Sequence, residues 1–394
     1  MANVSSSNGL EKHPKLRFKG FSEPWKTVRI GEVYAERSER GAEDMELLSV
    51  TMNDGVKMRS DIEGKDNSSE DKSNYKIVRA GDMVYNSMRM WQGANGISPW
   101  DGIVSPAYTV LKPRMPISNG FFAALFKTHR LINEFRKNSQ GMTSDTWNLK
   151  YPQIETIKTC IPALAEQEKI ADFLMALDQR IEKQRTLVEH LKKYKRGVMR
   201  EIFETKTLFS SHHYSLVQLG NECRFFSGGT PQSGNSKYYG GSIPFIRSGE
   251  VHKSITELTL TEEGLNNSSA KMVEVGDLIM ALYGATSGEV DISKISGAIN
   301  QAILCIRPNT INRHYLKFLF ECKKEDILKT YLQGGQGNLS AEIIKKLYFE
   351  IPLPSEQQET VDFLVALENK ISLEDSKLEK LFSVRNGLLQ QLFI

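Results

Sequence analysis

The chain of 394 residues has few of the features that mark membrane, secreted or redox proteins. It contains no run of about 18 apolar residues, so no transmembrane helix is predicted, and its first residues, MANVSSSNGLEKHPKLRF, have no apolar core typical of a secretory signal. Its cysteines are Cys160, Cys223, Cys305 and Cys322, far apart and without a CxxC pair. Free thiols in a reducing cytosol are therefore expected rather than a disulfide, metal or redox site.

Catalytic motifs are also missing. The seven histidines include no HExxH or other metal-ligand spacing. The nearest approach to a phosphate-binding loop is Gly229 followed by Gly234-Asn235-Ser236, where Asn235 occupies the position at which a lysine must neutralise phosphate. No GxGxxG follows a strand and no GxSxG occurs. We therefore predict no catalytic residue and no metal site, and a net charge of only +3 neither requires nor excludes a nucleic-acid partner.

A repeated segment is the strongest positive feature of the sequence. Residues 161–203 (IPALAEQEKIADFLMALDQRIEKQRTLVEHLKKYKRGVMREIF) align without a gap to residues 351–393 (IPLPSEQQETVDFLVALENKISLEDSKLEKLFSVRNGLLQQLF), at an offset of 190. Both begin with Ile-Pro and share a Glu-Gln pair, an Asp-Phe-Leu run and regularly spaced leucines and isoleucines. A chain built from two copies of one unit follows from this match.

Each repeated segment is predicted to be one long helix that pairs with the other. Apolar residues recur in alternating steps of three and four, which is the seam of a coiled coil. The seam is interrupted by Gln184 and Lys195 in the first copy and by Glu374 and Arg385 in the second. Antiparallel pairing would place Gln184 or Lys195 near acidic or basic partners on the other helix, and such pairs can fix the register. About 38 residues per helix give a length of roughly 57 Å at about 1.5 Å per residue.

The segments before the two helices repeat more faintly. Gly81-Asp82 and Gly276-Asp277 look like tight turns that open a buried strand. Strands are predicted at VYNS, YTVLKP, LIMALY and AILCIRP, and helices over 119–137 and 313–331. Each module is therefore mixed α and β, and the order along the chain is module, helix, module, helix.

The modules differ most in their loops. Residues 51–75 and the glycine-rich stretch 227–235 have no counterpart in the other module. Divergent loops on a shared scaffold suit two binding heads with different specificities.

The residues most suited to contact nucleic acid lie in such loops, where amide, hydroxyl, basic and aromatic side chains stand beside glycines that let the backbone approach a phosphate. Solvated surface loops have the same composition, and the tryptophans could equally be packing residues. The candidates are Arg89, Trp91, Gln92, Thr143, Ser144, Trp147, Asn148, Thr230, Gln232, Ser233, Lys237, Arg247, Ser248, Tyr283, Gln333, Gln336 and Asn338.

Together these features make the chain resemble the specificity subunit of type I restriction–modification systems. The resemblance covers nearly the whole chain and rests on PKLRFKGF with Trp25, Ser227-Gly228-Gly229-Thr230-Pro231 with Ile243-Pro244-Phe245, the two Gly-Asp turns and both Ile-Pro…Glu-Gln helices. The first module lacks a Gly-Thr-Pro stretch, so the DNA-contacting residues of the first module cannot be inferred from those of the second.

The resemblance implies an α+β fold with two target recognition domains, each followed by a long helix, and an antiparallel coiled coil with pseudo-two-fold symmetry. The expected boundaries are an N-terminal extension at 1–24, recognition domains at 25–160 and 214–350, helices at 161–204 and 351–394, and a linker at 205–213. Each domain would read one half of a split site in double-stranded DNA, and the helices would set the spacing and dock two modification subunits.

The same resemblance implies that the chemistry belongs to partner subunits in the cytoplasm. S-adenosylmethionine would be bound by the modification subunits, and ATP and Mg by the restriction subunits that translocate DNA, so no cofactor is expected in this chain. The alternative from the residues alone is a two-headed protein-interaction scaffold that binds no DNA. A fused enzyme would require methyltransferase and nuclease motifs that the sequence lacks.

Overall fold

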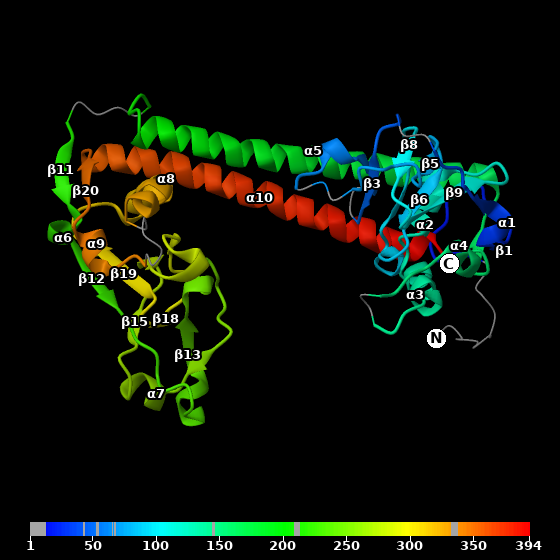
Figure 1. The fold of residues 1–394 in the computed structure, drawn as a ribbon. Helices are drawn as coiled ribbons and strands as arrows, with labels where there is room; N and C mark the ends of the chain where they lie inside the picture. The colour runs from blue at the N-terminus through cyan, green and yellow to red at the C-terminus, as the bar shows by residue number, and fades with distance from the viewer. Residues whose placement is uncertain are drawn as a thin grey trace. The chain divides into compact units, whose positions relative to one another are not determined.

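The computed structural model describes residues 13–41, 44–52, 55–64, 66, 68–143, 146–208, 213–331 and 338–394. These residues form two compact units (Figure 1), divided on the long helices between Arg185 and Thr186 and between Asp375 and Ser376. The first unit contains the N-terminal module, the first part of one long helix and the last part of the other. The second unit contains the second module, the last part of the first long helix and the first part of the second.

The two long helices are α5 (Leu164–Phe203) and α10 (Pro354–Leu392), of 40 and 39 residues. In the first unit, Ile170 near the start of α5 shares a core cluster with Leu389 near the end of α10. In the second unit, Ile202 near the end of α5 shares a core cluster with Leu364 near the start of α10. The helices therefore pack antiparallel, which confirms the pairing predicted from the repeat.

Two of the polar seam residues, Lys195 and Arg385, meet opposite charges on the facing helix, as predicted. In the second unit Lys195 forms an ion pair with Glu368, with Nζ 2.5 Å from Oε1. In the first unit Arg385 forms an ion pair with Asp178. These two pairs occupy equivalent positions, because Glu368 and Arg385 lie 190 residues after Asp178 and Lys195 respectively.

A second pair of helix contacts is related in the same way but differs in chemistry. Lys192 Nζ lies 3.4 Å from Asp375 Oδ2 in the second unit. The equivalent contact in the first unit places the Arg185 guanidinium over the Phe382 ring, 5.7 Å from its centroid. The pseudo-two-fold relation of the two helices thus holds at the level of individual contacts, while the side chains have diverged.

The first module begins with a segment that packs on both long helices. The Leu16 amide donates to the Gln391 carbonyl of α10 at 2.9 Å, and the ring of Phe18 lies edge-on to Phe173 of α5 with centroids 5.5 Å apart. Arg17 forms two hydrogen bonds of 2.8 Å with the buried carboxylate of Glu166. The N-terminal segment from residue 13 is therefore part of the helix-packing core of its unit.

The helices of the first module are short. They are α1 (Ile30–Val33), η1 (Arg59–Asp61), η2 (Met90–Gln92), α2 (Asn119–Leu125), α3 (His129–Asn138) and α4 (Tyr151–Ile154). Its strands are β1 (Lys26–Arg29), β2 (Tyr34–Glu36), β3 (Leu48–Thr51), β4 (Gly55–Met58), β5 (Lys76–Val78), β6 (Met83–Asn86), β7 (Asn95–Ile97), β8 (Gly102–Val104), β9 (Tyr108–Pro113) and β10 (Lys158–Ile161).

The second module contains the helices α6 (Leu219–Glu222), η3 (Ser236–Tyr238), η4 (Ser248–Glu250), α7 (Glu262–Asn266), η5 (Gly284–Thr286), α8 (Arg313–Tyr331) and α9 (Ala341–Lys345). Its strands are β11 (Ser215–Gln218), β12 (Cys223–Ser227), β13 (Tyr239–Ile246), β14 (Thr259–Leu260), β15 (Lys271–Val273), β16 (Leu278–Ala281), β17 (Val290–Ile292), β18 (Gly297–Ile299), β19 (Ile303–Pro308) and β20 (Tyr348–Ile351).

Both modules share one sheet topology. Each has an antiparallel four-stranded sheet, in the order β2-β9-β6-β7 or β12-β19-β16-β17, and a two-stranded ribbon, β1-β10 or β11-β20, that leads into a long helix. The modules differ in the strands that accompany a second antiparallel pair, which is β5-β8 in the first module and β15-β18 in the second. The first module there has the separate hairpin β3-β4, whereas in the second β13 joins β18 in parallel and β14 extends the sheet.

The two Gly-Asp turns have the structure that the sequence predicts. Gly81 and Gly276 adopt positive φ values of 91° and 94°, which an L side chain rarely adopts. The buried carboxylates of Asp82 and Asp277 each accept a hydrogen bond from the backbone amide three residues earlier, at 2.8 and 2.9 Å. Each turn leads into a central strand, β6 or β16, as expected.

The single helix predicted over 119–137 is wrong. The structure has two helices there, α2 and α3, while α8 covers the predicted range 313–331 as one helix. The break occurs because Thr128 caps the second helix, with its hydroxyl accepting from the Leu131 amide.

Among the described residues, no helix is long and apolar enough to cross a membrane, and no group of three or more histidine, cysteine, aspartate or glutamate side chains is placed to hold a metal ion. The four cysteines are free thiols, of which Cys322 alone is not fully buried.

Candidate nucleic-acid interface

In the first unit, two of the predicted loops meet through a pair of tryptophans. The rings of Trp91 and Trp147 pack edge to face with centroids 5.1 Å apart, and the guanidinium of Arg136 stacks over Trp147 at 5.4 Å. The Trp91 indole N–H donates to the Met88 carbonyl at 3.0 Å. Both tryptophans remain half-buried, so they join the two loops and are still partly accessible to solvent.

The polar candidates of this unit surround the tryptophan pair. Arg89 is exposed at the start of η2, and Thr143 is exposed in the second loop. Gln92 Oε1 and Asn148 Oδ1 are buried and have no hydrogen-bond partner among the described residues. A buried oxygen without a hydrogen bond destabilises the folded state, so a water molecule or a bound group is expected to donate a hydrogen bond to each. Ser144 lies outside the described residues.

In the second unit, three loops gather at one end of the central sheet. Strand β12 ends at Ser227 opposite Leu304, and β16 ends at Ala281 opposite Ile303, so both lead out at the point where β19 begins. The stretch containing Thr230, the turn before Ile303 and the loop containing Tyr283 are therefore neighbours. Antiparallel strands that end together place their loops on one edge.

Close packing accounts for two glycines of the glycine-rich stretch, Gly228 and Gly229. A β-carbon on Gly228 would lie far inside van der Waals contact with the Ile299 carbonyl oxygen, and one on Gly229 would overlap the Ser269 hydroxyl. The backbone after β12 therefore passes directly over the end of β18, and only glycine fits. Packing therefore explains these two glycines without a phosphate-binding role.

Beyond these glycines lies a cavity of about 690 Å³. Its lining combines apolar groups with three of the predicted residues, Thr230, Ser233 and Arg247. The other lining residues, which were not among the predicted site residues, are Ser236, Tyr239, Gly240, Phe245, Leu258 and Asn300. Gln232 and Lys237 are exposed nearby, and Ser248 opens η4.

The charge of Arg247 is already balanced. Its guanidinium contacts the carboxylates of Glu250, with Nε 3.3 Å from Oε2, and of Glu257. Hydrogen bonds to these two carboxylates raise the pKa of Arg247 above its ordinary value. The cavity therefore carries a fixed arginine with little net positive charge.

In each unit, one backbone hydrogen bond joins the loop after the central strand, β6 or β16, to the loop before the short helix α4 or α9. The Leu339 amide donates to the Leu282 carbonyl at 3.0 Å, and the Leu149 amide donates to the Ser87 carbonyl at 2.8 Å. Tyr283 is half-buried against the core of the second unit and Asn338 is exposed. Gln333 and Gln336 lie outside the described residues.

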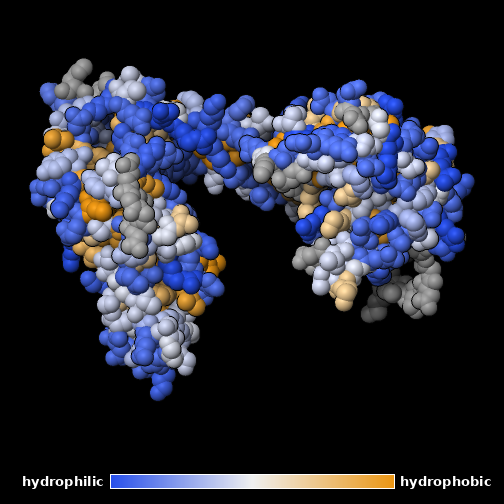
Figure 2. Space-filling view, viewed as in Figure 1, coloured by the Kyte–Doolittle hydropathy of each residue, from blue (hydrophilic) through white to orange (hydrophobic). Residues whose placement is uncertain are grey.

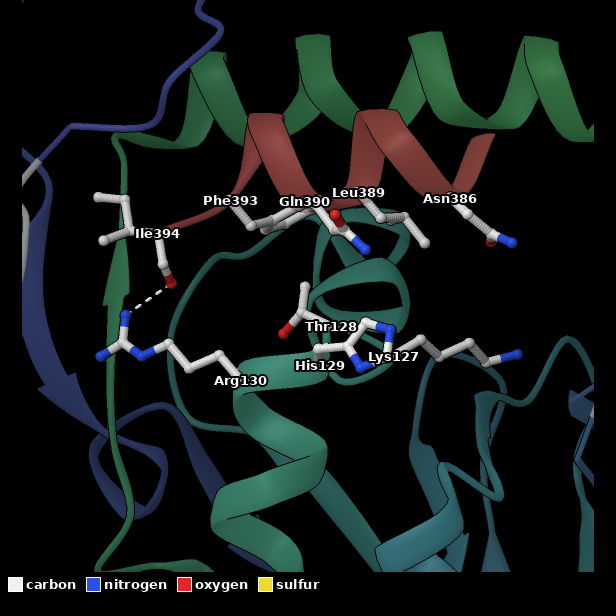
Figure 3. A pocket seen from close by; sticks show the side chains of 9 residues that line it. All are labelled: Lys127, Thr128, His129, Arg130, Asn386, Leu389, Gln390, Phe393 and Ile394. Atoms are coloured by element: carbon white, nitrogen blue, oxygen red, sulfur yellow. Dashed lines mark hydrogen bonds between the residues drawn. The ribbon is translucent and has the colours of Figure 1, made fainter. Parts of the chain in front are cut away.

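Each unit also has a groove where the end of a long helix lies against a helical segment of the module. In the first unit the groove has a volume of about 450 Å³ and runs between Lys127–Arg130 and the end of α10. Arg130 crosses it to donate from Nη1 to the main-chain oxygen of Ile394 at 2.6 Å (Figure 3).

The second unit repeats this groove between the end of α5 and α8, with a volume of about 850 Å³. Arg196 and Met199 line it at the positions of Asn386 and Leu389 in the first unit, 190 residues apart. The lining has diverged, since the first groove contains Leu389 and Phe393, whereas the second is lined mostly by charged side chains.

Comparison with known proteins agrees with this duplicated architecture. The family model described as the type I restriction modification DNA specificity domain matches residues 22–190 and again residues 214–382. The chain therefore belongs to the family of type I restriction–modification specificity subunits and carries the family's domain twice.

Individual relatives are distant but cover most of the chain. The putative type I restriction enzyme MjaX specificity subunit of Methanocaldococcus jannaschii is 22% identical over 360 residues, covering 83% of this chain and 81% of its own. The MjaVIII specificity subunit of the same organism is 23% identical over 346 residues, covering 80% and 79%.

Solved structures show the same fold. The S subunit of a type I restriction–modification system from M. genitalium superposes with a TM-score of 0.60 at 15% identity, covering 97% of this chain and 99% of the other. A chain from a structure describing assembly and conformational transition of the type I system gives a TM-score of 0.62 at 16% identity, covering 94% and 97%.

Proposed function

We propose that this specificity subunit reads a split DNA site with its two modules and acts without catalytic residues of its own. The observation that carries the proposal is the duplication of whole contacts: the seam ion pairs, the Gly-Asp turns and the joined loops all recur in the second unit. A duplicated reader with approximate two-fold symmetry suits a target made of two half-sites. The family match favours this reading over a scaffold that binds no DNA.

The loops at the sheet ends are the proposed DNA-contacting surfaces. They carry the predicted residues Arg89, Trp91 and Thr143 in the first unit and Thr230, Ser233 and Lys237 in the second. Their amide, hydroxyl and basic groups suit base edges and phosphates in the major groove. Because the loop residues differ between the units, the two half-sites are expected to differ in sequence.

The long helices are proposed to set the spacing of the half-sites and to dock two modification subunits. Their exposed faces carry apolar side chains, including Tyr194 and Val384, which are 56% and 53% exposed and equivalent in the repeat. The visible molecular surface is otherwise mainly hydrophilic, with small separate groups of hydrophobic residues (Figure 2). Repeated apolar positions on exposed helices suit a partner that binds twice.

The reactions of the complex are proposed to reside in its other subunits in the cytoplasm. Modification subunits would bind S-adenosylmethionine and methylate adenine, and restriction subunits would use ATP and Mg. This division agrees with a chain that lacks the motifs for these reactions. The similarity to specificity subunits of type I restriction enzymes supports the same division.

The test is DNA binding and methyl transfer by this chain purified together with its modification subunit, on a random-sequence duplex library. Recovery of a split motif with a fixed gap, and methylated adenines in both halves, is the expected result. Exchanging residues 214–350 for another module should then change one half-site only. Formation of a stable complex without sequence selection would contradict DNA recognition by the modules.

A further inference from the structure

Gln301 stands at the sheet end of the second module on a rigid turn. It is exposed between β18 and β19, while its neighbours Ala302 and Ile303 are buried. The side-chain oxygen of Asn300 accepts from the Ala302 amide at 3.1 Å, and the Asn300 carbonyl accepts from the Ile303 amide at 3.2 Å. The backbone is thus fixed under a side chain that faces solvent.

The amide of Gln301 is oriented by Thr230. The Thr230 hydroxyl donates to Gln301 Oε1 at 2.7 Å. Thr230 is itself held, because Gly228 is packed on the end of β18 and the Tyr239 hydroxyl donates to the Pro231 carbonyl at 2.8 Å. With Oε1 turned toward Thr230, the amide group presents its N–H donors and one remaining lone pair outward.

The surface beside this pair is apolar. The 690 Å³ cavity is walled by Tyr239, Phe245 and Leu258, with Thr230 and Asn300 at its lining. Its arginine is balanced by two carboxylates, which makes the cavity a poor site for a phosphate. A flat apolar group next to an oriented amide is the better fit.

We propose that Gln301, oriented by Thr230, reads an adenine in the half-site of the second module, with the methyl group of the paired thymine against the apolar cavity. A glutamine amide matches adenine by accepting from N6 and donating to N7, and apolar surfaces recognise the thymine methyl. Pre-orientation by Thr230 lowers the entropy that the glutamine loses on binding. The inference rests on the proposed function and adds a specificity-determining residue to it.

The experiment uses the full chain with its modification subunit and the random duplex library. Gln301→Ala is expected to relax one A·T position of one half-site by on the order of 10- to 100-fold, with the other half-site unchanged as internal control. Gln301→Glu is expected to shift that position toward cytosine, because a carboxylate accepts from the cytosine amino group. Thr230→Val should weaken the same preference, and Thr230→Ser should retain it.

A second readout uses the selected duplex. Replacing the adenine at that position by 7-deaza-adenine should lower the affinity of the wild-type complex but have little further effect with Gln301→Ala, because the substitution already removes the donor to N7. Replacing the paired thymine by deoxyuridine should lower the affinity of both the wild-type and the Gln301→Ala complex, because the methyl group contacts the apolar cavity rather than Gln301. An unchanged motif in Gln301→Ala, or a uniform loss of affinity with no change in sequence preference, would overturn the inference. If the wild-type complex selects no motif at all, the proposed function fails first.

Discussion

Individual glycines in the second module are fixed by packing rather than by turn geometry. Gly228 has the Ile299 carbonyl oxygen where a β-carbon would lie, whereas Gly234, six residues later, has open space there. The two positions therefore separate a steric requirement from the general flexibility of a glycine-rich loop.

Gly228→Ala is expected to destabilise the second module by about 2–3 kcal/mol, because the strand end or the loop must shift to admit a methyl group. Gly234→Ala is the matched control and should change stability by less than about 0.5 kcal/mol. Thermal or urea unfolding of both variants measures the difference. Equal stabilities would contradict the packing seen at Ile299.

His252 makes the stability of the second unit depend on pH. Its ring nitrogens lie 3.1 Å from Asp291 Oδ2 and 3.0 Å from Glu289 Oε2, and the hydrogen bond with Asp291 is the main reason that its pKa is raised. Burial would raise the pKa of Asp291, but His252, Lys317 and Lys294 lower it to about 2. Lys324 pairs with Glu289 on the other side.

Because the folded pKa of His252 is raised, its contribution is present below the unfolded value of about 6.5 and is lost as the pH rises through the folded value. His252→Gln should therefore cost about 0.5–1 kcal/mol near pH 5.5, a small amount since the side chain is 53% exposed, and little near pH 8.5. Urea unfolding across this range tests it. His190→Gln, at an exposed position of α5, is the matched surface control.

At the scale of elements, a cluster of charges joins α8 to both long helices in the second unit. Lys317 Nζ lies 2.7 Å from Glu368 Oε1 on α10 and 3.0 Å from Glu321 Oε1, and Lys195 of α5 contacts the same two carboxylates. Burial would lower the pKa of Lys317, but the two carboxylates raise it. The cluster therefore fixes where the module attaches to its pair of helices.

Lys317→Met is expected to destabilise the second unit by about 2–3 kcal/mol, because it leaves partly buried carboxylates without their central cation. The loss should shrink at acidic pH as Glu368 becomes protonated. Burial would raise the pKa of Glu368, but Lys317 and Lys195 hold it below its ordinary value, so the change is expected below about pH 4.5. Lys329→Met on the exposed face of α8 is the control and should be near neutral. Equilibrium unfolding at pH 7 and about pH 3 provides the measurement, and a pH-independent loss would refute the electrostatic explanation.

The first unit has no lysine at the position of Lys317, and the comparison shows what the sequence could and could not predict. The amides of Ser118 and Asn312 each donate to the glutamine after the Ile-Pro motif, Gln167 or Gln357, which aligns the modules at an offset of 194. Ala123 then stands where Lys317 stands in the second unit. The sequence aligned the helices but not these module residues, because the modules match only faintly.

The long helices and central strands could be predicted because their periodicity and Gly-Asp turns are local signals. The break between α2 and α3 could not, since it depends on Thr128 acting as a cap rather than continuing the helix. Gln301 was missed as a site residue for a different reason. Its importance comes from a hydrogen bond to Thr230, 71 residues away, which no local pattern contains.

At the scale of the whole molecule, the repeat makes each half of the chain a candidate for self-association. In a dimer of residues 1–204, each helix would pair with a copy of itself, so Asp178 would meet Lys195 but Arg185 would meet Lys192 of the other copy. In a dimer of residues 205–394, Glu368 would meet Arg385 and Asp375 would meet Phe382. The helix contacts of each unit define these pairings.

The second half is therefore expected to dimerise more tightly than the first, because only the first brings two like-charged pairs together across the seam. Sedimentation equilibrium of the two fragments at low salt should give a dissociation constant lower by roughly 5- to 10-fold for residues 205–394, and the gap should narrow as salt screens the repulsion. Arg185→Asp in the first fragment copies Asp375 of the second half and should strengthen its dimer. If that substitution has no effect, the antiparallel register that aligns position 185 with position 192 does not form in the fragment.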